Sequence, residues 1–318
     1  MEAVVFEQAG DAREVLALRR VDDPVPLAGH VVVAVESRTV QPSDLSFIRG
    51  AYRIRPVFPQ IAGLSGAGRV VAVGEGVRLA AGTRVAFRSP GAWAELVSVP
   101  VERTFTVPEG VDIDLAAQFP LNPITAWGLL QMADVRRSDW IALSAAASSV
   151  AGLVNALAQE RGIRVIGLAR PSALADLAPG MVGIAVEDPK LTDRVREATG
   201  GKGVAAFLDS VGGPLLNAVF PTLEPGATIV AYGAMSDEPA LVRNATLVYS
   251  NLTWRGFGID RFVSRLAERE REVMIASLWD GLRAGRLPLP VRVRVALREF
   301  AEGLRLATET RGGKIVLA

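Results

Sequence analysis

The sequence predicts an α/β protein in which a β-rich N-terminal part precedes a doubly wound parallel sheet. Short β-branched runs separated by Gly, Pro and Asp fill residues 1 to about 115. From residue 140 onward, apolar strand-like runs alternate with helical segments. The 318 residues correspond to about two domains, and the 50% apolar content is enough for a large buried core.

Four strands are predicted in the N-terminal part, and their spacing is typical of a small antiparallel barrel or sandwich. They lie at residues 30–37, 68–77, 83–87 and 94–100. Near Ile113 the spacing of apolar residues becomes helical, and Pro120 and Pro123 interrupt this helical stretch. This change of period marks the end of the β-rich part.

The next part predicts a parallel sheet with helices on both faces, because continuous apolar strands alternate with helices. The strands are predicted at 140–145, 163–169, 182–186, 204–208 and 227–232, and the helices at 150–159, 190–198 and 214–223. Beyond residue 257 the pattern predicts one long helix at 262–284, then strands at 288–297 and 314–317 on either side of a helix at 298–307. A doubly wound sheet of this kind is typical of nucleotide-binding domains.

The composition excludes several classes of function. The 35 Lys and Arg residues are nearly balanced by 34 Asp and Glu, so no basic face for nucleic acid or an anionic membrane is predicted. The chain has no Cys and one His, His30. Thiolate zinc sites, iron–sulfur clusters and a cysteine nucleophile are therefore excluded, no metal is expected, and a His-based triad could use only His30.

A soluble cytoplasmic protein is expected. The start of the chain, MEAVVFEQAG, has acidic residues and lacks the basic-then-apolar order of a signal peptide. Two uncharged stretches, 115–133 and 141–158, are interrupted by Pro or by Ser, Gly and Asn. They therefore do not predict membrane spans.

A dinucleotide-binding sheet needs a tight turn after its first strand, where N–H groups at a helix start meet the pyrophosphate. Here this turn is SAAASSVAG at 144–152, in which Gly152 is the only glycine. Ser148 and Ser149 can donate their hydroxyls to phosphate and cap the helix. The small residues would equally allow close helix–sheet packing without a ligand, so the turn alone leaves both interpretations open.

The end of the second parallel strand predicts the kind of nucleotide. NAD sites place an acidic residue here, whereas Arg accommodates a 2′-phosphate with its planar set of donors. The sequence reads IGLARPS, with Arg170 at this position and no Asp or Glu adjacent. This predicts NADPH, and a solvated Arg with no ligand is the alternative.

Six segments occur in one order along the chain and together resemble a known family. They are PSDLSFIRGAYRIRPVFPQIAGLSGAGRVVAVGEGV (42–77), LNPITAW (121–127), LDSVGG (208–213), EPGATIVAYGAM (224–235), LTWRGF (252–257) and GGKIVLA (312–318). The chain resembles the zinc-independent medium-chain dehydrogenase/reductases, most closely their trans-2-enoyl thioester (enoyl-CoA) reductases, with the quinone reductase branch next.

The resemblance implies a Rossmann domain at 119–259 inserted into a GroES-like β-barrel catalytic domain formed by 1–118 and 260–318. It also implies NADPH as cofactor, no metal, and a homodimer joined through the Rossmann sheets. Tyr52 matches the tyrosine that the enoyl reductases use as proton donor. The positions that match cofactor contacts are Asn122, Ala147, Ser148, Ser149, Val150, Arg170, Tyr232, Gly233, Ala234, Met235, Phe257 and Lys314.

Three positions depart from the family pattern: Gln41 replaces Asn, Ser65 replaces Glu and Ala151 replaces Gly. The expected reaction is NADPH-dependent reduction of the C=C bond of a 2-enoyl thioester, with Tyr52 donating a proton because a phenol is protonated at neutral pH. Tyr52 could instead be an ordinary loop aromatic. The alternatives are a quinone or other alkene/carbonyl reductase, which needs little acid catalysis from the protein, and a protein without catalysis. The sequence leaves open the acyl chain length and the carrier, coenzyme A or acyl-carrier protein.

Overall fold

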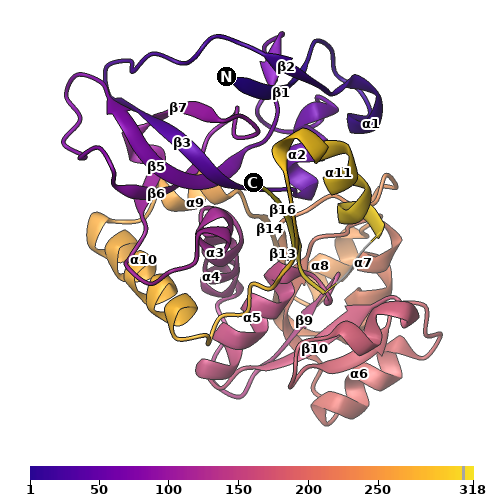
Figure 1. The fold of residues 1–318 in the computed structure, drawn as a ribbon. Coiled ribbons are helices and arrows are strands. Elements are labelled where there is room, and N and C mark those ends of the chain that lie inside the picture. The colour runs from indigo at the N-terminus through magenta and orange to yellow at the C-terminus, as the bar shows by residue number, and fades with distance from the viewer. Residues whose placement is uncertain (310–311) are drawn as a thin grey trace. The chain divides into compact units, whose positions relative to one another are not determined.

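The computed structural model describes residues 1–309 and 312–318, which form two compact units (Figure 1). Unit 1 consists of Met1–Leu121 and Leu289–Ala318, and unit 2 is the continuous segment Asn122–Pro288. Residues 119–121, expected in the Rossmann domain, fall in unit 1, and residues 260–288, expected in the catalytic domain, fall in unit 2.

Unit 1 contains a seven-stranded sheet of order β15-β16-β3-β5-β6-β8, with β7 also paired to β3. Its strands are β3 (His30–Thr39), β5 (Ser65–Val73), β6 (Arg84–Arg88), β7 (Leu96–Pro100), β8 (Thr104–Thr106), β15 (Val291–Val295) and β16 (Lys314–Leu317). A three-stranded sheet pairs β2 (Ala17–Arg20), β1 (Glu2–Phe6) and β4 (Gln60–Ile61) in that order. Only β15 and β16 pair in parallel among these strands, so the predicted antiparallel character is confirmed.

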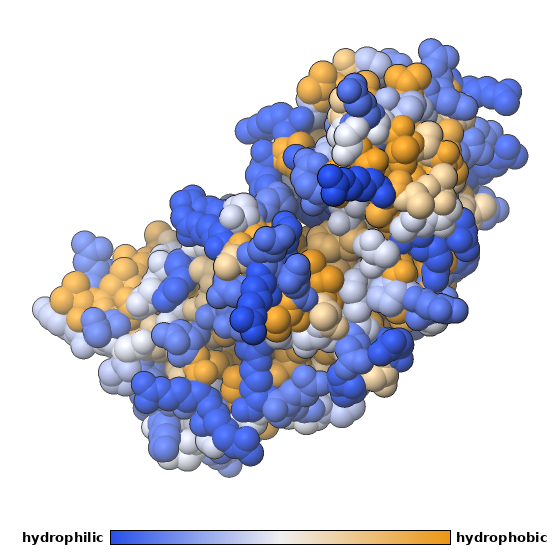
Figure 2. All heavy atoms as spheres, turned by 90° about the vertical axis from the view of Figure 1, so that its left-hand side faces the viewer, coloured by the Kyte–Doolittle hydropathy of each residue, from blue (hydrophilic) through white to orange (hydrophobic). Residues whose placement is uncertain are grey.

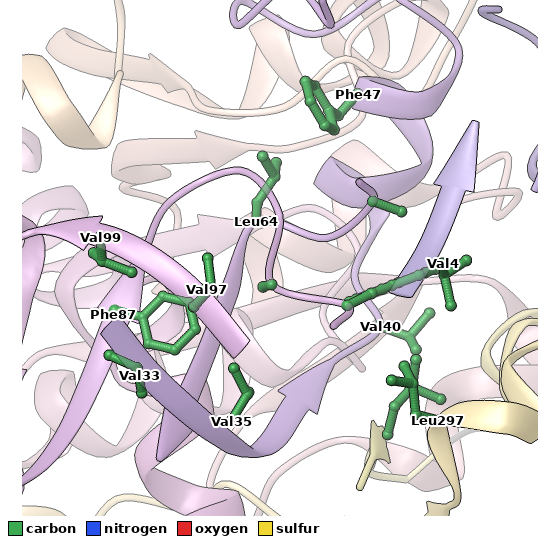
Figure 3. Close-up of a cluster of buried hydrophobic side chains, with 14 of the residues drawn as sticks. Val4, Val33, Val35, Val40, Phe47, Leu64, Phe87, Val97, Val99 and Leu297 are labelled. Carbon is green, nitrogen blue, oxygen red and sulfur yellow. The ribbon is translucent and has the colours of Figure 1, made fainter. Parts of the chain in front are cut away.

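The core of unit 1 is built from the β-branched residues that predicted the strands. Val33 of β3 and Phe87 of β6 are fully buried, and Val97 and Val99 of β7 close the cluster around them (Figure 3). Leu297, from the C-terminal segment, packs in the same cluster. Burial of each such side chain stabilises the fold by about 1.5–3 kcal/mol.

Short helices connect the strands of unit 1. They are α1 (Ala12–Val15), α2 (Pro42–Ile48), α3 (Ile113–Gln118) and α11 (Phe300–Glu309), with 3-10 turns at Val101–Arg103 and Leu297–Glu299. Helix α2 starts where Gln41 N donates to Asp44 Oδ2 at 2.8 Å, and Pro42 occupies its first turn, where a missing N–H costs nothing.

Unit 2 is a six-stranded parallel sheet of order β11-β10-β9-β12-β13-β14. The strands are β9 (Trp140–Leu143), β10 (Arg164–Ala169), β11 (Val182–Ala185), β12 (Val204–Asp209), β13 (Leu223–Ala231) and β14 (Thr253–Gly256). From β9 the chain adds β10 and β11 on one side. It then adds β12, β13 and β14 on the other side of β9. The predicted doubly wound sheet is thus confirmed, and its strand order reverses between β9 and β12, where such sheets bind ligands.

The helices of unit 2 are α4 (Asn122–Ala133), α5 (Ser149–Glu160), α6 (Leu191–Thr199), α7 (Pro214–Val219), α8 (Asn244–Tyr249), α9 (Ile259–Val263) and α10 (Glu268–Arg283), with 3-10 turns at Pro171–Asp176 and Phe220–Thr222. The single helix predicted at 262–284 is wrong, because the chain forms α9 and α10 instead. Ser264 ends α9, and a new helix begins where Ala267 N donates to the Glu270 side chain at 2.9 Å.

The surface mixes charged and apolar side chains, as the balanced composition predicts. Figure 2 shows hydrophilic side chains spread over the visible face with smaller hydrophobic patches between them. None of the helices in the described part of the chain combines the length and the hydropathy needed to cross a bilayer.

Candidate functional site

The carboxyl ends of the parallel strands in unit 2 bring most of the predicted cofactor residues to one edge of the sheet. The turn at residues 144–148 follows β9, Arg170 follows β10, residues 232–235 follow β13, and Phe257 follows β14. Parallel strands share this edge, so residues that are up to about a hundred positions apart in the sequence meet there. Arg170 is exposed at the carboxyl end of β10.

The turn after β9 is tight although it lacks glycine. Ala145 takes a left-handed backbone conformation with φ 47°, which a small side chain tolerates better than a large one. Ser148 caps α5, and its hydroxyl accepts from Ala151 N at 3.3 Å. Ala147, Ser149 and Val150 complete the helix entry. N–H groups in the first turn of a helix have no intrahelical acceptor and are suited to an anion.

A buried polar cluster joins the turn after β9 to the end of β12. Ser144 Oγ donates to Asp209 Oδ1 at 2.8 Å and accepts from Ser210 N at 2.8 Å. The Asp209 carboxylate also accepts from the backbone N–H groups of Val211 and Gly212 at 2.9–3.1 Å. The cluster therefore holds the two central strand ends together at the point where the strand order reverses. Ser144 lies in the predicted turn and Asp209 and Ser210 lie in the LDSVGG segment, but none of them was predicted as a site residue.

The segment after β13 crosses the turn that follows β12. Tyr232 N donates to Asp209 O at 2.8 Å, and burial raises the pKa of the Tyr232 phenol to about 12. Gly233 is required at its position, because a Cβ there would lie 2.4 Å from Ser210 O. Ala234 and Met235 follow on the surface, and Met235 is 65% exposed. This exposed end leaves apolar surface available to a planar ring.

Asn122 and Phe257 are two further predicted cofactor contacts in unit 2. Asn122 begins α4 and is 2% exposed, yet its Nδ2 has no hydrogen-bond acceptor among the described residues. Phe257 N donates to Ala231 O at 2.7 Å, and its ring lies 5.6 Å from that of Phe262. A buried amide donor without an acceptor costs about 1–3 kcal/mol unless a ligand supplies one.

These features of unit 2 fit a phosphate-bearing dinucleotide. A small-residue turn and the start of α5 are suited to a diphosphate, exposed Arg170 to a further phosphate, and the Asn122 amide to an oxygen acceptor. Lys314, the remaining predicted contact, lies in unit 1 on β16. Burial lowers the pKa of Lys314 to about 8 against the attraction of Asp44.

Tyr52 lies in unit 1, in the loop between α2 and β4, and packs half-buried against the core. Its hydroxyl accepts a hydrogen bond of 2.6 Å from Arg88 Nη2. The guanidinium of Arg53 lies 5.5 Å from the centre of the ring. Arg88 ends β6 and is 9% exposed, so burial lowers the pKa of its guanidinium. Arg88 was not among the residues predicted from sequence, although a charged residue at the end of an apolar strand was the available signal.

Two side chains that depart from the family pattern, Gln41 and Ser65, lie in one hydrogen-bonded group. Gln41 Nε2 donates to Thr39 Oγ1 at 2.9 Å and approaches Ser65 Oγ at 3.4 Å, while Thr39 and Ser65 hydroxyls lie 3.0 Å apart. All three side chains are buried. A neutral hydrogen-bonded group thus occupies the positions of the family's Asn and Glu.

Asp44 lies beside this group with no exposed surface. Its two carboxylate oxygens accept from Gln41 N at 2.8 Å and Leu64 N at 2.9 Å. Burial raises the pKa of Asp44 to about 7, against these two donors and the attraction of Arg88 and Lys314. The carboxyl therefore changes charge near neutral pH.

Folding should take up a proton at Asp44 between pH 3.8, its ordinary pKa, and about pH 7. Stability contributed by the protonated carboxyl is present below this window and is lost as pH rises through it, with a slope of up to about 1.4 kcal/mol per pH unit. We expect wild type to lose free energy of unfolding relative to Asp44→Asn as pH rises from 4 to 7 in urea titrations. A constant difference between the two proteins would contradict the raised pKa.

His30 belongs neither to the predicted cofactor residues of unit 2 nor to the residues around Tyr52 and Asp44 in unit 1. It begins β3, and its Nδ1 lies 3.1 Å from Ser98 Oγ. Within residues 1–309 and 312–318, no group of three or more His, Asp and Glu side chains could hold a metal ion.

Two protein families match the chain in the order of its parts. Residues 27–109 match the alcohol dehydrogenase GroES-like domain, and residues 150–275 match the zinc-binding dehydrogenase domain. The mitochondrial enoyl-[acyl-carrier-protein] reductases of Bos taurus and Arabidopsis thaliana are each 28% identical to the chain. These alignments cover 97% and 95% of the chain and 86% and 84% of the relatives.

Solved structures with the same fold match the chain over its whole length. A mycobacterial quinone oxidoreductase is 27% identical with a TM-score of 0.88, covering 100% of this chain and 99% of its own. A mycobacterial protein solved in complex with NADPH is 28% identical with a TM-score of 0.90 and the same coverage. The chain belongs to the medium-chain dehydrogenase/reductase family of oxidoreductases.

Proposed function

We propose that the protein is an NADPH-dependent, zinc-independent reductase of the C=C bond of a 2-enoyl thioester, carried by coenzyme A or an acyl-carrier protein. The observation that carries this proposal is the environment of the Tyr52 hydroxyl. Tyr52 is the one tyrosine among the described residues of unit 1, and it lies half-buried with its hydroxyl held by a guanidinium. The near full-length similarity to enoyl-[acyl-carrier-protein] reductases supports the same substrate class.

The reaction needs a proton donor, because adding a hydride to the β-carbon of an enoyl thioester leaves negative charge on the carbonyl oxygen and a carbanion-like α-carbon. Bound NADPH supplies the hydride. The Tyr52 hydroxyl supplies the proton to the α-carbon and recovers one from solvent. One hydride and one proton thus convert the alkene into the saturated thioester.

The residues of unit 2 bind the cofactor in this proposal. The turn at Ala147, Ser148, Ser149 and Val150 binds the diphosphate, and Arg170 binds the 2′-phosphate. Residues 232–235, Phe257 and Asn122 orient the nicotinamide half.

Replacing Arg170 with Ser should weaken NADPH binding about 10- to 100-fold, the loss of about 1.5–3 kcal/mol that a charged hydrogen bond provides. Binding of NADH, which lacks the 2′-phosphate, should stay unchanged. Both are measured by fluorescence titration. Arg164→Ser is the matched control, since Arg164 is an exposed Arg at the opposite end of the same strand. Equal losses for NADPH and NADH would remove Arg170 from the phosphate site.

A purified preparation should consume NADPH with crotonyl-CoA and much less with an ortho-quinone. Quinone reduction is the second candidate, supported by the similarity to the mycobacterial quinone oxidoreductase. Turnover of the quinone alone would favour it over thioester reduction. If neither substrate is consumed and excess NADPH leaves the thermal midpoint unchanged, the protein is not an NADPH-dependent reductase.

We infer that the protein forms a homodimer through the open edge of the unit 2 sheet. Strand β14 is one of the two edge strands of this sheet, and its four residues are exposed. Apolar side chains lie exposed on or just before it: Leu241 (73%), Val248 (69%), Tyr249 (86%) and Trp254 (41%). An uncovered strand edge with apolar neighbours is suited to pairing with a second copy.

Wild type should therefore have twice the 33.7 kDa mass of one chain in sedimentation equilibrium. Tyr249→Asp should shift it toward the mass of one chain, because a buried unpaired carboxylate is costly. Val71→Asp, at a 50% exposed apolar position on β5, serves as control and should keep the wild-type mass. A wild-type mass of 33.7 kDa would refute the dimer.

A further inference from the structure

We propose that Arg88 is a positioning residue that turns the Tyr52 hydroxyl into a directed proton donor and stabilises the oxygen once the proton has left. The proposal rests on the proposed role of Tyr52 and adds a second residue to it. Its basis is the 2.6 Å hydrogen bond from Arg88 Nη2 to the Tyr52 oxygen, between a residue at the end of β6 and one in the α2–β4 loop.

The direction of this hydrogen bond is fixed by chemistry. A guanidinium has only donors, so the phenol oxygen must accept from Arg88. The phenol's own O–H is then directed away from Arg88 and toward another acceptor. A water molecule or a backbone carbonyl at the same place could accept the phenol proton, whereas Arg88 cannot. Arg88 therefore keeps the proton of Tyr52 available for substrate.

The sheet holds Arg88 in place. Its backbone pairs with Ser65 of β5, and Phe87 before it is fully buried in the core of unit 1. Tyr52 lies in a loop without regular structure between α2 and β4. The hydrogen bond thus fixes a loop side chain to a rigid strand, which is how a reacting group is kept within reach of its target.

Charge near the phenol favours loss of the proton to substrate. The phenolate formed in that step faces the guanidinium of Arg88 at 2.6 Å and that of Arg53 at 5.5 Å from the ring centre. Arg88 is buried, so its attraction for the developing negative charge is little screened by water. The O–H bond of Tyr52 breaks as the α-carbon–H bond forms, and the phenolate takes up a solvent proton afterwards.

The test combines Arg88→Met and Arg88→Lys with Tyr52→Phe in the full-length protein. Arg84→Met is the matched control: it removes an Arg of the same strand that donates to Val111 O at 2.9 Å and does not contact Tyr52. Turnover of crotonyl-CoA gives kcat and KM, fluorescence titration gives the NADPH affinity, and thermal unfolding reports whether each variant is folded. Arg88→Lys preserves the charge should Arg88→Met fail to fold.

We expect Arg88→Met to lower kcat about 30- to 100-fold, within the range of a general acid's contribution, while KM and NADPH affinity change less than about threefold. Arg88→Lys should recover about tenfold of this loss, and Arg84→Met should behave as wild type. In the Tyr52→Phe background, Arg88→Met should cost less than about threefold more, because the two residues act as one unit. Equal losses in both backgrounds, or no loss in either, would overturn the proposal.

A spectroscopic measurement separates this proposal from the choice of substrate. The chain has three tyrosines, so the Raman doublet of Tyr52 is obtained by subtracting the spectrum of Tyr52→Phe. Wild type and Arg84→Met should show the signature of a phenol oxygen that accepts a strong hydrogen bond, and Arg88→Met should lose it. If wild type reduces no thioester, the proposed function fails and this spectrum still decides the contact. An unchanged doublet in Arg88→Met refutes it.

Discussion

Tyr52→Phe should lower kcat for reduction of a 2-enoyl thioester by about 10²- to 10⁴-fold, the range over which a positioned acid accelerates a proton transfer. The change removes one oxygen from a half-buried ring and leaves the ring's packing against the unit 1 core intact. Initial rates of NADPH consumption with crotonyl-CoA measure the effect. NADPH affinity should be unchanged, because Tyr52 lies in unit 1 and the proposed diphosphate turn and Arg170 lie in unit 2.

The same variant gives the opposite result if quinones are the substrate. Quinone reduction needs little from the protein as an acid, so Tyr52→Phe should then retain most of its activity. A variant that keeps wild-type turnover of the thioester would show that Tyr52 is only a wall residue. Thermal unfolding provides the control that the loss of activity is not a loss of folded protein.

Asp209→Ala should lower the free energy of unfolding by roughly 3–5 kcal/mol, among the largest effects expected of a single substitution. The carboxylate is 2% exposed and accepts from the Ser144 hydroxyl and from two backbone N–H groups. Removing it leaves these donors without an acceptor in a buried site. Urea unfolding followed by circular dichroism measures the change.

Asp237→Ala is the control for this substitution. Asp237 is exposed in the same unit, so the change should stay within about 0.5 kcal/mol. Ser144→Ala removes one partner of the carboxylate and should cost about 1 kcal/mol. A small effect of Asp209→Ala would mean that water or a local rearrangement satisfies the donors of the β12–α7 turn.

The elements predicted from sequence are those in which the spacing of apolar residues stays helical, or stays strand-like, along most of the element. Strands β9, β10 and β12 and the second half of β13 were found because they are nearly continuous buried runs. Strand β14 was not predicted as a strand, because TWRG is exposed at all four positions and carries no apolar pattern. The break between α9 and α10 was missed because the residues around it have high helix propensity.

The site was predicted to the extent that it is local in sequence. The turn at residues 144–152 and Arg170 follow directly from strand ends, so their positions could be inferred. The partners of Tyr52 and Ser144 could not, since Arg88 is 36 residues from Tyr52 and Asp209 is 65 residues from Ser144. Such contacts depend on which strands become neighbours, and no short-range pattern encodes that.

The two-segment composition of unit 1 has a consequence for the order of events during synthesis. Unit 2 is continuous, so the whole unit is available once Pro288 has left the ribosome. Unit 1 remains incomplete at that moment, because β3 pairs with β16 and the core includes Ile315 and Leu317. Domains usually fold in the order in which they leave the ribosome. Here the later-made unit can reach its final structure first, whereas unit 1 stays incomplete until the C-terminal segment emerges.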